Sequence, residues 1–405
     1  MILKYDVAVA GAGPAGLSAA FAAASSGASV LIIEQNSEIG SPTRTSGGSF
    51  IRELVELEIP ESLFHPVRQV RFVSPHSSAT FQYDQPMMCV MDVRGVYQHL
   101  ATLAVEAGAT IWLASKCFDV LKDGERIIGV LVETRTKKKI EVRADVVIDA
   151  TGYAGRLLRQ AGLSPRIQRF GVGAEFDMFA PRCDEDEAVL VVGSQFAPSG
   201  YGWFFPWGQH RVRVGVGVIH PDQSSNPVGL LESFVAAASN LGVNLTGAQP
   251  IEYHFGLIPS EMAENFVSDG ILAIGDAAGH ASTLVGEGIR WAIKAGRIAG
   301  GVAASAAKSG DASFAVLSQF QSEWLRQHGR NLRIANMINR KISKWDDRKW
   351  DERTELLSTL SPKEFAAALQ SDFSLGWALG VAWAHPRLVK AGFEKILQRI
   401  APGSS

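Results

Sequence analysis

Short apolar runs that end in glycine recur along the chain and predict buried parallel strands. Residues 7–10 form such a run, and the alanine-rich stretch over residues 14–26 predicts the helix that follows it. Residues 29–33 form the next apolar run. A strand, a helix and a second buried strand in this order are typical of a βαβ unit. The pattern therefore predicts an α/β fold that opens with a Rossmann-like unit.

Between the first strand and the helix lies a turn with the spacing Gly-x-Gly-x-x-Gly. Gly11 permits the tight turn, Gly13 lets the backbone approach a pyrophosphate, and Gly16 lets helix and strand pack closely. The helix N-terminus would offer free N–H groups to the phosphates. Glu34, at the end of the second strand, is placed to bind an adenosine ribose. The turn predicts a dinucleotide site without separating FAD from NAD, and a turn with no ligand is the alternative.

A second glycine-rich segment, residues 275–279, follows the apolar run of residues 271–274. Asp276 is placed there to bind a ribityl chain, and a helix that starts near Gly288 would aim its positive end at a flavin ring. A plain strand, turn and helix is the alternative. Residues 144–152 form another strand that ends in a glycine turn. Since no second Gly-x-Gly-x-x-Gly turn follows a strand, we expect no separate NAD(P) domain.

Composition narrows the function classes. The chain has 405 residues, 46% of them hydrophobic, and a formal net charge of -2, so no basic field points to nucleic acid. Cys89, Cys117 and Cys183 are widely separated, so we expect neither disulfides nor a metal site, and a cytoplasmic location fits. No uncharged apolar run reaches about 18 residues, so no transmembrane span is expected. The early first strand leaves no room for a signal peptide.

An aromatic strand at residues 201–208 occupies the middle of the chain, ahead of an alternating segment at residues 212–218. Because side chains alternate along a strand, four aromatic residues share one face: Tyr201, Trp203, Phe205 and Trp207. This face is either ordinary core packing or the wall of an apolar tunnel that ends at the flavin. In a tunnel, a hydrocarbon would be held by burial, at about 25 cal/mol per Å².

These segments resemble known flavoproteins. The glycine-rich segments together resemble the glutathione-reductase-type FAD proteins of the aromatic-hydroxylase branch. Tyr201-Gly202-Trp203-Phe204-Phe205-Pro206 is similar to the Y-x-W-x-F-P signature of the geranylgeranyl reductase family. Residues 34–44, residues 256–259 and the tail from residue 320 to 400 are similar to that family as well. The resemblance implies FAD, an isoprenoid lipid whose C=C bonds are reduced by hydride transfer, and an external electron donor such as NAD(P)H or a ferredoxin-like protein.

The resemblance also implies an architecture and a set of site residues. The architecture is a discontinuous FAD domain (1–60, 90–155 and 265–310), an inserted sheet-based substrate domain (61–89 and 156–264) and a C-terminal helical region (311–405). From the sequence itself, His280 is the candidate proton donor because it lies four residues past Asp276, with a structural hydrogen bond as the alternative. An arginine at the position of Arg94 contacts the cofactor in this branch, whereas an exposed helix-start arginine is the alternative. The expected cofactor-binding residues are Gly11, Gly13, Ala15, Gly16, Glu34, Gln35, Arg44, Thr45, Arg94, Gly152, Asp276, Gly286, Gly288 and Ile289.

Two departures from the family pattern fall near the expected flavin. Arg44 is followed by Thr45-Ser46-Gly47-Gly48, without the cysteine that the family often carries there. Residues 282–286 read Ser-Thr-Leu-Val-Gly, where family members often have Asn-Pro-Leu-Thr-Gly. Both departures leave the substrate and the proton transfer open, and they do not affect the expectation of FAD.

Other functions remain open at this point. A single-component flavin monooxygenase shares the expected architecture, and a non-catalytic flavin carrier is a further alternative. A flavin halogenase is disfavoured because the chain has no lysine between Lys4 and Lys116. The tail mixes basic residues with Trp324, Trp345, Trp350, Trp377 and Trp383, and it either caps the catalytic domains or rests on a membrane surface.

Overall fold

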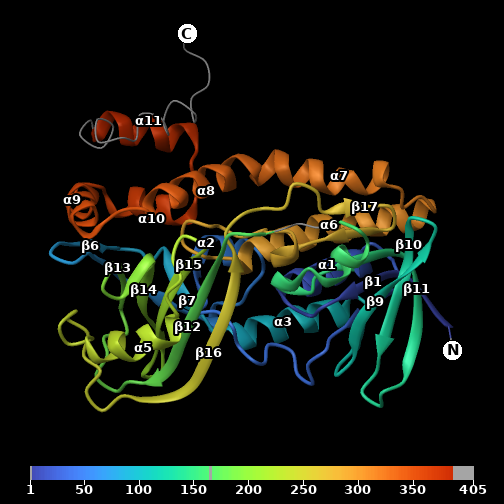
Figure 1. Ribbon diagram of the computed structural model, residues 1–405, viewed down its shortest axis with the longest axis horizontal. Coiled ribbons are helices and arrows are strands. Elements are labelled where there is room, and N and C mark those ends of the chain that lie inside the picture. The colour runs from blue at the N-terminus through green and yellow to red at the C-terminus, as the bar shows by residue number, and fades with distance from the viewer. Residues whose placement is uncertain (1, 164–166, 386–405) are drawn as a thin grey trace, which may run out of the picture.

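The first layer of the protein is a mostly parallel sheet that begins with the N-terminal strand. The computed structural model describes residues 2–163 and 167–385. Its eight-stranded sheet has the order β17-β18-β11-β1-β2-β8, and a hairpin of β9 and β10 extends it from β11 (Figure 1). The strands are β1 (Ile2–Ala10), β2 (Val30–Ile33), β8 (Thr110–Trp112), β9 (Lys116–Asp123), β10 (Arg126–Glu133), β11 (Lys139–Asp149), β17 (Val267–Ser268) and β18 (Ile271–Ala273).

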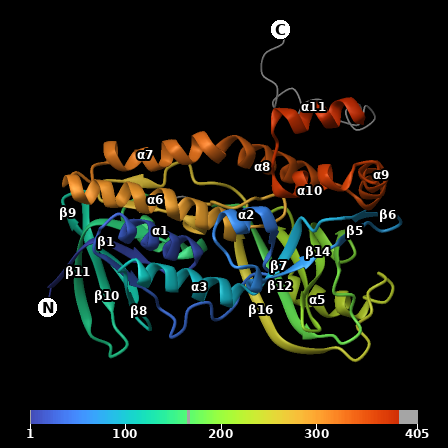
Figure 2. The same ribbon diagram turned by 180° about the vertical axis from the view of Figure 1, so that it is seen from behind.

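Helices cover this sheet and supply most of the main core. Helix α1 (Pro14–Ser25) packs against α6 (Ile289–Ser309) and α3 (Val93–Glu106), as Figure 2 shows. The approach of α1 and α6 is close because a Cβ at Gly296 would lie 2.3 Å from the carbonyl oxygen of Ala15. The first strand, the glycine turn and α1 therefore lie where the sequence pattern predicts them. The predicted α/β class is confirmed.

The second layer is a seven-stranded sheet of order β16-β12-β15-β14-β13-β5-β6. Helix α5 (Pro227–Ala236) covers one face of it, and Phe234 packs on β14 where Gly202 leaves room. The strands are β5 (Gln69–Val73), β6 (Ser78–Gln82), β12 (Phe170–Phe179), β13 (Glu187–Gly193), β14 (Ala197–Gly208), β15 (Arg211–His220) and β16 (Gln249–Pro259). A small sheet of order β3-β7-β4 (Gly48–Phe50, Met88–Met91 and Phe64–Val67) connects the layers.

The other face of this sheet holds an indole ring on a bed of glycines. Along β15, the valines point toward α5, while Gly215 and Gly217 point to the opposite face. A Cβ at Gly215 would lie 2.3 Å from Cζ2 of Trp203, and Cβ atoms at Gly217 and Gly173 would lie 3.4 and 3.6 Å from its ring. The valine–glycine alternation therefore makes a shallow site in which the ring of Trp203 lies flat on the sheet.

The C-terminal third is helical and lies across both layers (Figure 1). Residues 386–405, the end of the predicted helical region, lie outside the described residues. Within residues 2–163 and 167–385, no helix is long and apolar enough to cross a membrane. The predicted domain boundaries stay a prediction. The helices are α7 (Phe314–Trp324), α8 (Arg330–Ile342), α9 (Asp347–Leu357), α10 (Pro362–Gln370) and α11 (Leu375–Ala384), besides the short α2 (Ile51–Glu56) and α4 (Arg156–Gln160).

Candidate active site

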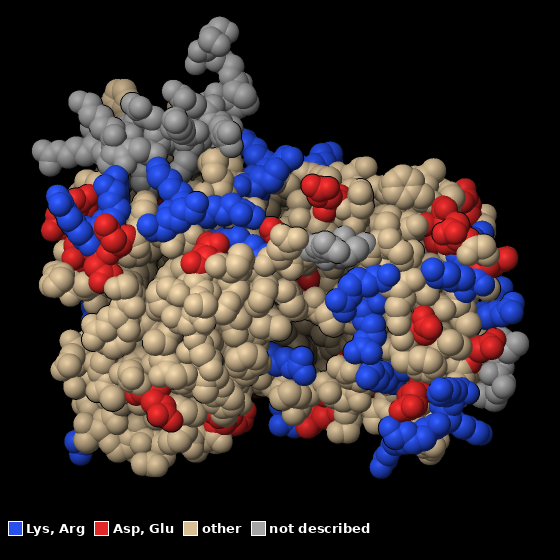
Figure 3. Space-filling model, viewed as in Figure 1, with Lys and Arg blue, Asp and Glu red and all other residues tan. Residues whose placement is uncertain are grey.

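A cavity of ≈ 1080 Å³ joins the glycine turns of the first sheet to the aromatic strand and the C-terminal helices. Figure 3 shows a hollow on this face between the β12–β16 region and the part of the molecule that contains β1. Pockets for a single small ligand usually measure about 300–1,000 Å³. The volume is therefore sufficient for a cofactor together with part of a second, apolar molecule.

The first glycine turn forms the cofactor end of this cavity. Gly11 has φ +105°, and a Cβ there would lie 2.3 Å from the carbonyl oxygen of Ala150. A Cβ at Gly16 would lie 2.0 Å from the carbonyl oxygen of Gly11, so both glycines are required by close backbone packing. A Cβ at Gly13 would instead meet no described protein atom within 4 Å. This open space lies at the N-terminus of α1, where phosphate groups bind favourably.

Two acidic residues flank the turn in different ways. Glu34 is 8% exposed, and its carboxylate accepts hydrogen bonds from the backbone N–H groups of Ala12 and Asn36, both at 2.8 Å. Asp149 is fully buried and accepts hydrogen bonds from Thr151 and from the N–H of Leu158. Glu34 therefore lies at the cavity edge, where a ribose could bind, whereas Asp149 only fixes the neighbouring turn.

Asp276 has the features of a ligand-binding carboxylate. It follows β18 and lines the cavity, and its carboxylate has no hydrogen-bond partner among the described residues. Burial raises its pKa to about 6. The uncapped N-terminus of α6 lies beside it, because a Cβ at Gly288 would be 3.5 Å from its Oδ1. An unpartnered carboxylate facing a cavity fits a ligand with hydroxyl groups, such as the ribityl chain of FAD.

The cavity brings together twelve of the expected cofactor-binding residues from four segments of the chain. Of the fourteen expected residues, Gly16 and Arg94 are the two that lie outside the lining. Gly16 packs beneath the turn. Arg94 lies in the first turn of α3 with its side chain 54% exposed, and it pairs with Glu38, which itself lines the cavity. A contact between Arg94 and the cofactor stays a prediction. The expected residues in the lining are Gly11, Gly13, Ala15, Glu34, Gln35, Arg44, Thr45, Gly152, Asp276, Gly286, Gly288 and Ile289.

The loop that contains Arg44 is held against the second sheet. Arg213 donates hydrogen bonds from Nη1 to the carbonyl oxygens of Ser46 and Met91, at 2.8 and 2.9 Å. A Cβ at Gly256 would lie 2.2 Å from the carbonyl oxygen of Arg44, so β16 touches the same loop. The cofactor end and the aromatic sheet are thus fixed relative to one another.

A buried ionic network fixes the loop of residues 282–288. Arg290 is 1% exposed and binds Glu287 at 2.6 Å, Glu53 at 2.5 Å and the carbonyl oxygen of Gln370 at 2.5 Å. Lys294 binds the second oxygen of Glu53 at 2.5 Å. These contacts join α6 to α2 and to the end of α10. The network therefore couples the expected flavin site to the C-terminal helices.

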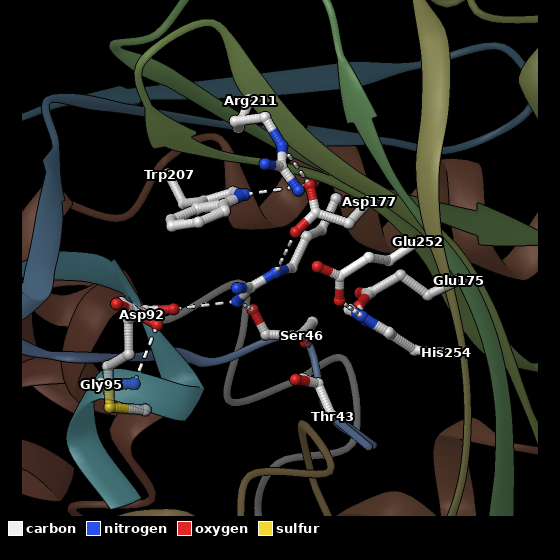
Figure 4. Close-up of polar contacts among 12 residues, drawn as sticks. Thr43, Ser46, Asp92, Gly95, Glu175, Asp177, Trp207, Arg211, Glu252 and His254 are labelled. Atoms are coloured by element: carbon white, nitrogen blue, oxygen red, sulfur yellow. Dashed lines mark hydrogen bonds and ion pairs between the residues drawn. The ribbon is translucent and has the colours of Figure 1, made fainter. Parts of the chain in front are cut away.

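Only half of the predicted aromatic face borders the cavity. Tyr201 and Trp203 line it, but Phe205 packs its ring against Gly48. Trp207 lies beside Arg211 and Arg213, and its indole N–H donates to Asp177 at 3.2 Å (Figure 4). The prediction is wrong for these last two residues as cavity walls, because the strand continues past the end of the cavity and its register shifts after Pro206.

The structure argues against His280 as a proton donor. Its side chain is completely buried outside the cavity lining, in contact with Phe266, Phe320 and Trp324. Burial, together with His328, lowers the pKa of His280 to about 3. The imidazole is therefore neutral at ordinary pH and is not among the side chains that line the cavity.

A polar network that the sequence analysis missed lies beside Trp203. The indole N–H of Trp203 donates to Glu175 at 2.7 Å, and the other oxygen of Glu175 lies 2.8 Å from Nδ1 of His254. Nε2 of His254 lies 3.0 Å from Glu252, and Figure 4 shows the three side chains pointing toward one another. Burial alone would lower the pKa of His254, but its hydrogen bonds with Glu175 and Glu252 raise it. The sequence offered one signal for this network, because Glu175 is a charged residue on the same face of β12 as Gly173, which lies under the ring of Trp203.

The far end of the cavity is apolar and is built by the tail. Helices α8 to α11 contribute side chains to this end of the cavity and close it. In this respect the tail acts as a cap on the catalytic layers. Tyr201 also donates a hydrogen bond to the carbonyl oxygen of Val285, which ties the aromatic strand to the flavin-side loop. The apolar lining includes Phe72, Leu190, Trp345, Trp350, Leu357, Leu360, Phe365, Phe373, Trp377 and Val381.

Comparisons with known proteins agree with this geometry. Residues 6–187 match the family model for FAD dependent oxidoreductases, and residues 171–257 match the geranylgeranyl reductase catalytic domain. The chain is 32% identical to digeranylgeranylglycerophospholipid reductase 2 of Methanopyrus kandleri over 372 residues, which cover 88% of this chain and 91% of that protein.

Solved structures share the whole architecture. A geranylgeranyl bacteriochlorophyll reductase-like protein from Thermoplasma acidophilum has a TM-score of 0.86 at 26% identity, covering 98% of this chain and 100% of that one. A flavin-dependent brominase has a TM-score of 0.66 at 20% identity, covering 91% of this chain and 98% of its own, and shows the fold alone. The chain belongs to the geranylgeranyl reductase family of FAD-dependent oxidoreductases.

Proposed function

We propose that this protein binds FAD and reduces C=C bonds in the isoprenoid chain of a lipid. The observation that carries the proposal is the continuity of the cavity from the glycine turn at Gly13 to the aromatic helices of the tail. A long hydrocarbon is the substrate class that can extend from the flavin ring into such an apolar space. The names of the relatives support the same substrate class.

In this proposal, the residues of the cofactor end hold FAD in an extended form. The N-terminus of α1 would face the pyrophosphate, with Glu34 at the adenosine ribose and Asp276 at the ribityl chain. When bound and reduced by an external donor, FAD supplies the hydride that the reaction needs. Gly286, Gly288 and Ile289 line the cavity at the uncapped N-terminus of α6, whose positive end favours negative charge on a neighbouring ring.

The protein must supply a proton to the second carbon of the reduced bond. His254 lines the cavity, is 4% exposed and carries a raised pKa through Glu175 and Glu252. A protonated imidazole at this position is a suitable acid, and Glu175 would hold its ring orientation. Glu175 also fixes Trp203, so one carboxylate positions both the acid and the aromatic wall.

The remaining side chains position the hydrocarbon and exclude water. Trp203 lies flat on the glycine bed, and the helices of the tail close the opposite side of the cavity. Burial of each Å² of apolar surface contributes about 25 cal/mol to binding. Exclusion of water would favour hydride transfer to carbon over reaction of the reduced cofactor with solvent species.

Contact with a lipid surface and the identity of the electron donor are part of the proposal. Helix α11 exposes Leu379 and Trp383, the latter by 91%, next to helices that line the apolar end of the cavity. An aromatic, apolar helix face of this kind is suited to shallow contact with a membrane, where a lipid substrate resides. The electrons would come from NAD(P)H or a ferredoxin-like protein.

Product analysis tests the proposed reaction. The protein, loaded with FAD, is incubated with a chemical reductant and a geranylgeranyl phospholipid, and the lipid is examined by mass spectrometry. We expect the lipid to gain two hydrogen atoms for each double bond reduced. Gain of an oxygen atom in air would instead identify a monooxygenase, and an unchanged lipid under all conditions would contradict both reactions.

A further inference from the structure

The apolar end of the cavity contains a buried guanidinium that no group within residues 2–163 and 167–385 neutralises. Arg353, on α9, lines the cavity and is 9% exposed. Its Nε and Nη1 atoms are buried and have no hydrogen-bond partner within residues 2–163 and 167–385. Its described contact is with the ring of Trp345, whose centroid lies 5.8 Å from the guanidinium carbon. A buried charge without a counter-charge is unfavourable, so its presence requires an explanation.

The acidic residues near Arg353 are engaged elsewhere. On α9, residues 350, 353 and 357 line the cavity, since helix positions three and four apart share a face. Asp351 binds Ser74 at 2.7 Å and His76 at 2.9 Å. Asp347 binds Ser194 at 2.7 Å, and Glu352 binds Lys349 at 2.8 Å. These carboxylates thus leave the guanidinium free to pair with a group from outside the chain.

The acids that line the cavity have partners of their own or lie at its cofactor end. Glu175 binds Trp203 and His254, and Glu38 pairs with Arg94. Glu34 accepts hydrogen bonds from the backbone near the glycine turn, where Asp276 also lies. Among the described residues, the acids of the cavity lining therefore leave the guanidinium of Arg353 available to an anionic ligand.

We infer that Arg353 binds the phosphate group of an amphiphilic substrate whose hydrocarbon chain occupies the apolar cavity. The planar guanidinium fork matches phosphate oxygens in two parallel hydrogen bonds. The tryptophan and leucine side chains around Arg353 favour an anion that arrives attached to a hydrocarbon. The inference rests on the proposed function in placing a lipid chain in this cavity, and it adds that Arg353 is the residue that recognises the phosphate of the headgroup.

Binding to the FAD-loaded protein tests this inference without measuring turnover. Farnesyl phosphate is compared with farnesol, and dodecyl phosphate with dodecanol, by titration of intrinsic tryptophan fluorescence. We expect each phosphate to bind roughly 10- to 100-fold more tightly than its alcohol, as for one charge-assisted hydrogen-bonding site. Inorganic phosphate alone should bind far more weakly than either ester.

Three variants assign this preference to Arg353. Arg353→Met should abolish the preference for phosphate while leaving the affinity for the alcohols unchanged, and Arg353→Lys should retain part of it. Arg348→Met is the matched control, because Arg348 lies on the same helix with its side chain 89% exposed. Arg353→Met should also melt no lower than the wild type in the absence of lipid, since it removes an unpaired buried charge.

The outcomes separate this inference from the proposed function. Equal affinities for phosphates and alcohols, or a preference that survives in Arg353→Met, would overturn it. Inorganic phosphate that binds as tightly as the esters would overturn the assignment to a lipid headgroup. If the dodecyl pair is discriminated through Arg353 but prenyl lipids are never reduced, the inference stands and the proposed function fails. If prenyl lipids are reduced but the protein shows no preference for phosphate, the proposed function stands and the inference about Arg353 fails.

Discussion

Replacing Gly215 with alanine tests whether the ring of Trp203 must lie flat on the sheet. The new Cβ would lie 2.3 Å from Cζ2 and 2.4 Å from Cε2 of Trp203. Carbon atoms in contact are about 3.5–4.0 Å apart, so the ring has to move by about 1 Å or more. Such overpacking costs about 1–3 kcal/mol.

The displaced ring affects function through its hydrogen bond as well. Trp203 donates to Glu175 at 2.7 Å, and a charge-assisted bond of this kind is worth about 1.5–3 kcal/mol. At about 1.4 kcal/mol for each factor of ten, we expect Gly215→Ala to lower kcat/KM for a prenyl lipid roughly 10- to 100-fold. The FAD content should not change, because the glycine turn and Asp276 are untouched.

Gly217→Ala is the matched control for this experiment. It lies on the same strand face, but its Cβ would be 3.4 Å from Cζ3 of Trp203, which is an ordinary contact. Turnover of a prenyl lipid, flavin absorbance and melting temperature are measured for both variants. Equal activity of Gly215→Ala and the control would refute the role of the glycine bed, and loss of FAD from Gly215→Ala would show that the strand serves the cofactor.

Two further predictions concern titratable groups. Burial raises the pKa of Asp276 to about 6, above its value of about 3.9 in an unfolded chain, so the carboxylate destabilises the FAD-free protein increasingly as the pH rises from about 4 to 6. Asp276→Asn should therefore raise the melting temperature of the FAD-free protein at pH 8, with no difference near pH 4, while weakening FAD binding; a lower melting temperature at pH 8 would contradict this. Since Glu175 raises the pKa of His254, Glu175→Gln should move the alkaline loss of kcat/KM to lower pH, and an unchanged pH profile would exclude His254 as the acid.

The cofactor end could be predicted from the sequence because its signals are local. The close contacts of Gly11 and Gly16 arise within one strand–turn–helix unit, so their spacing alone implies the geometry. Asp276 was identifiable in the same way, as the acid directly after a buried strand. Arg94 was placed by analogy, and the structure pairs it with Glu38.

The substrate end depends on contacts between distant segments. Trp203 and His254 meet at Glu175, which lies on a third strand, and no spacing along the chain reveals such a cluster. Alternation correctly put Tyr201 and Trp203 on the cavity face, but it could not show that the cavity ends before Phe205. His280 was misjudged because proximity to Asp276 in sequence did not reveal that its ring turns into the aromatic core.

In the proposed reaction, reduced FAD in this protein passes its electrons to an isoprenoid double bond. The most direct measurement follows flavin absorbance after the FAD-loaded protein is reduced without oxygen and mixed with a geranylgeranyl phospholipid. We expect the absorbance of oxidised flavin to return with this lipid and not to return with its fully saturated counterpart. Flavin that stays reduced with the unsaturated lipid, and is reoxidised only when oxygen is admitted, would contradict it.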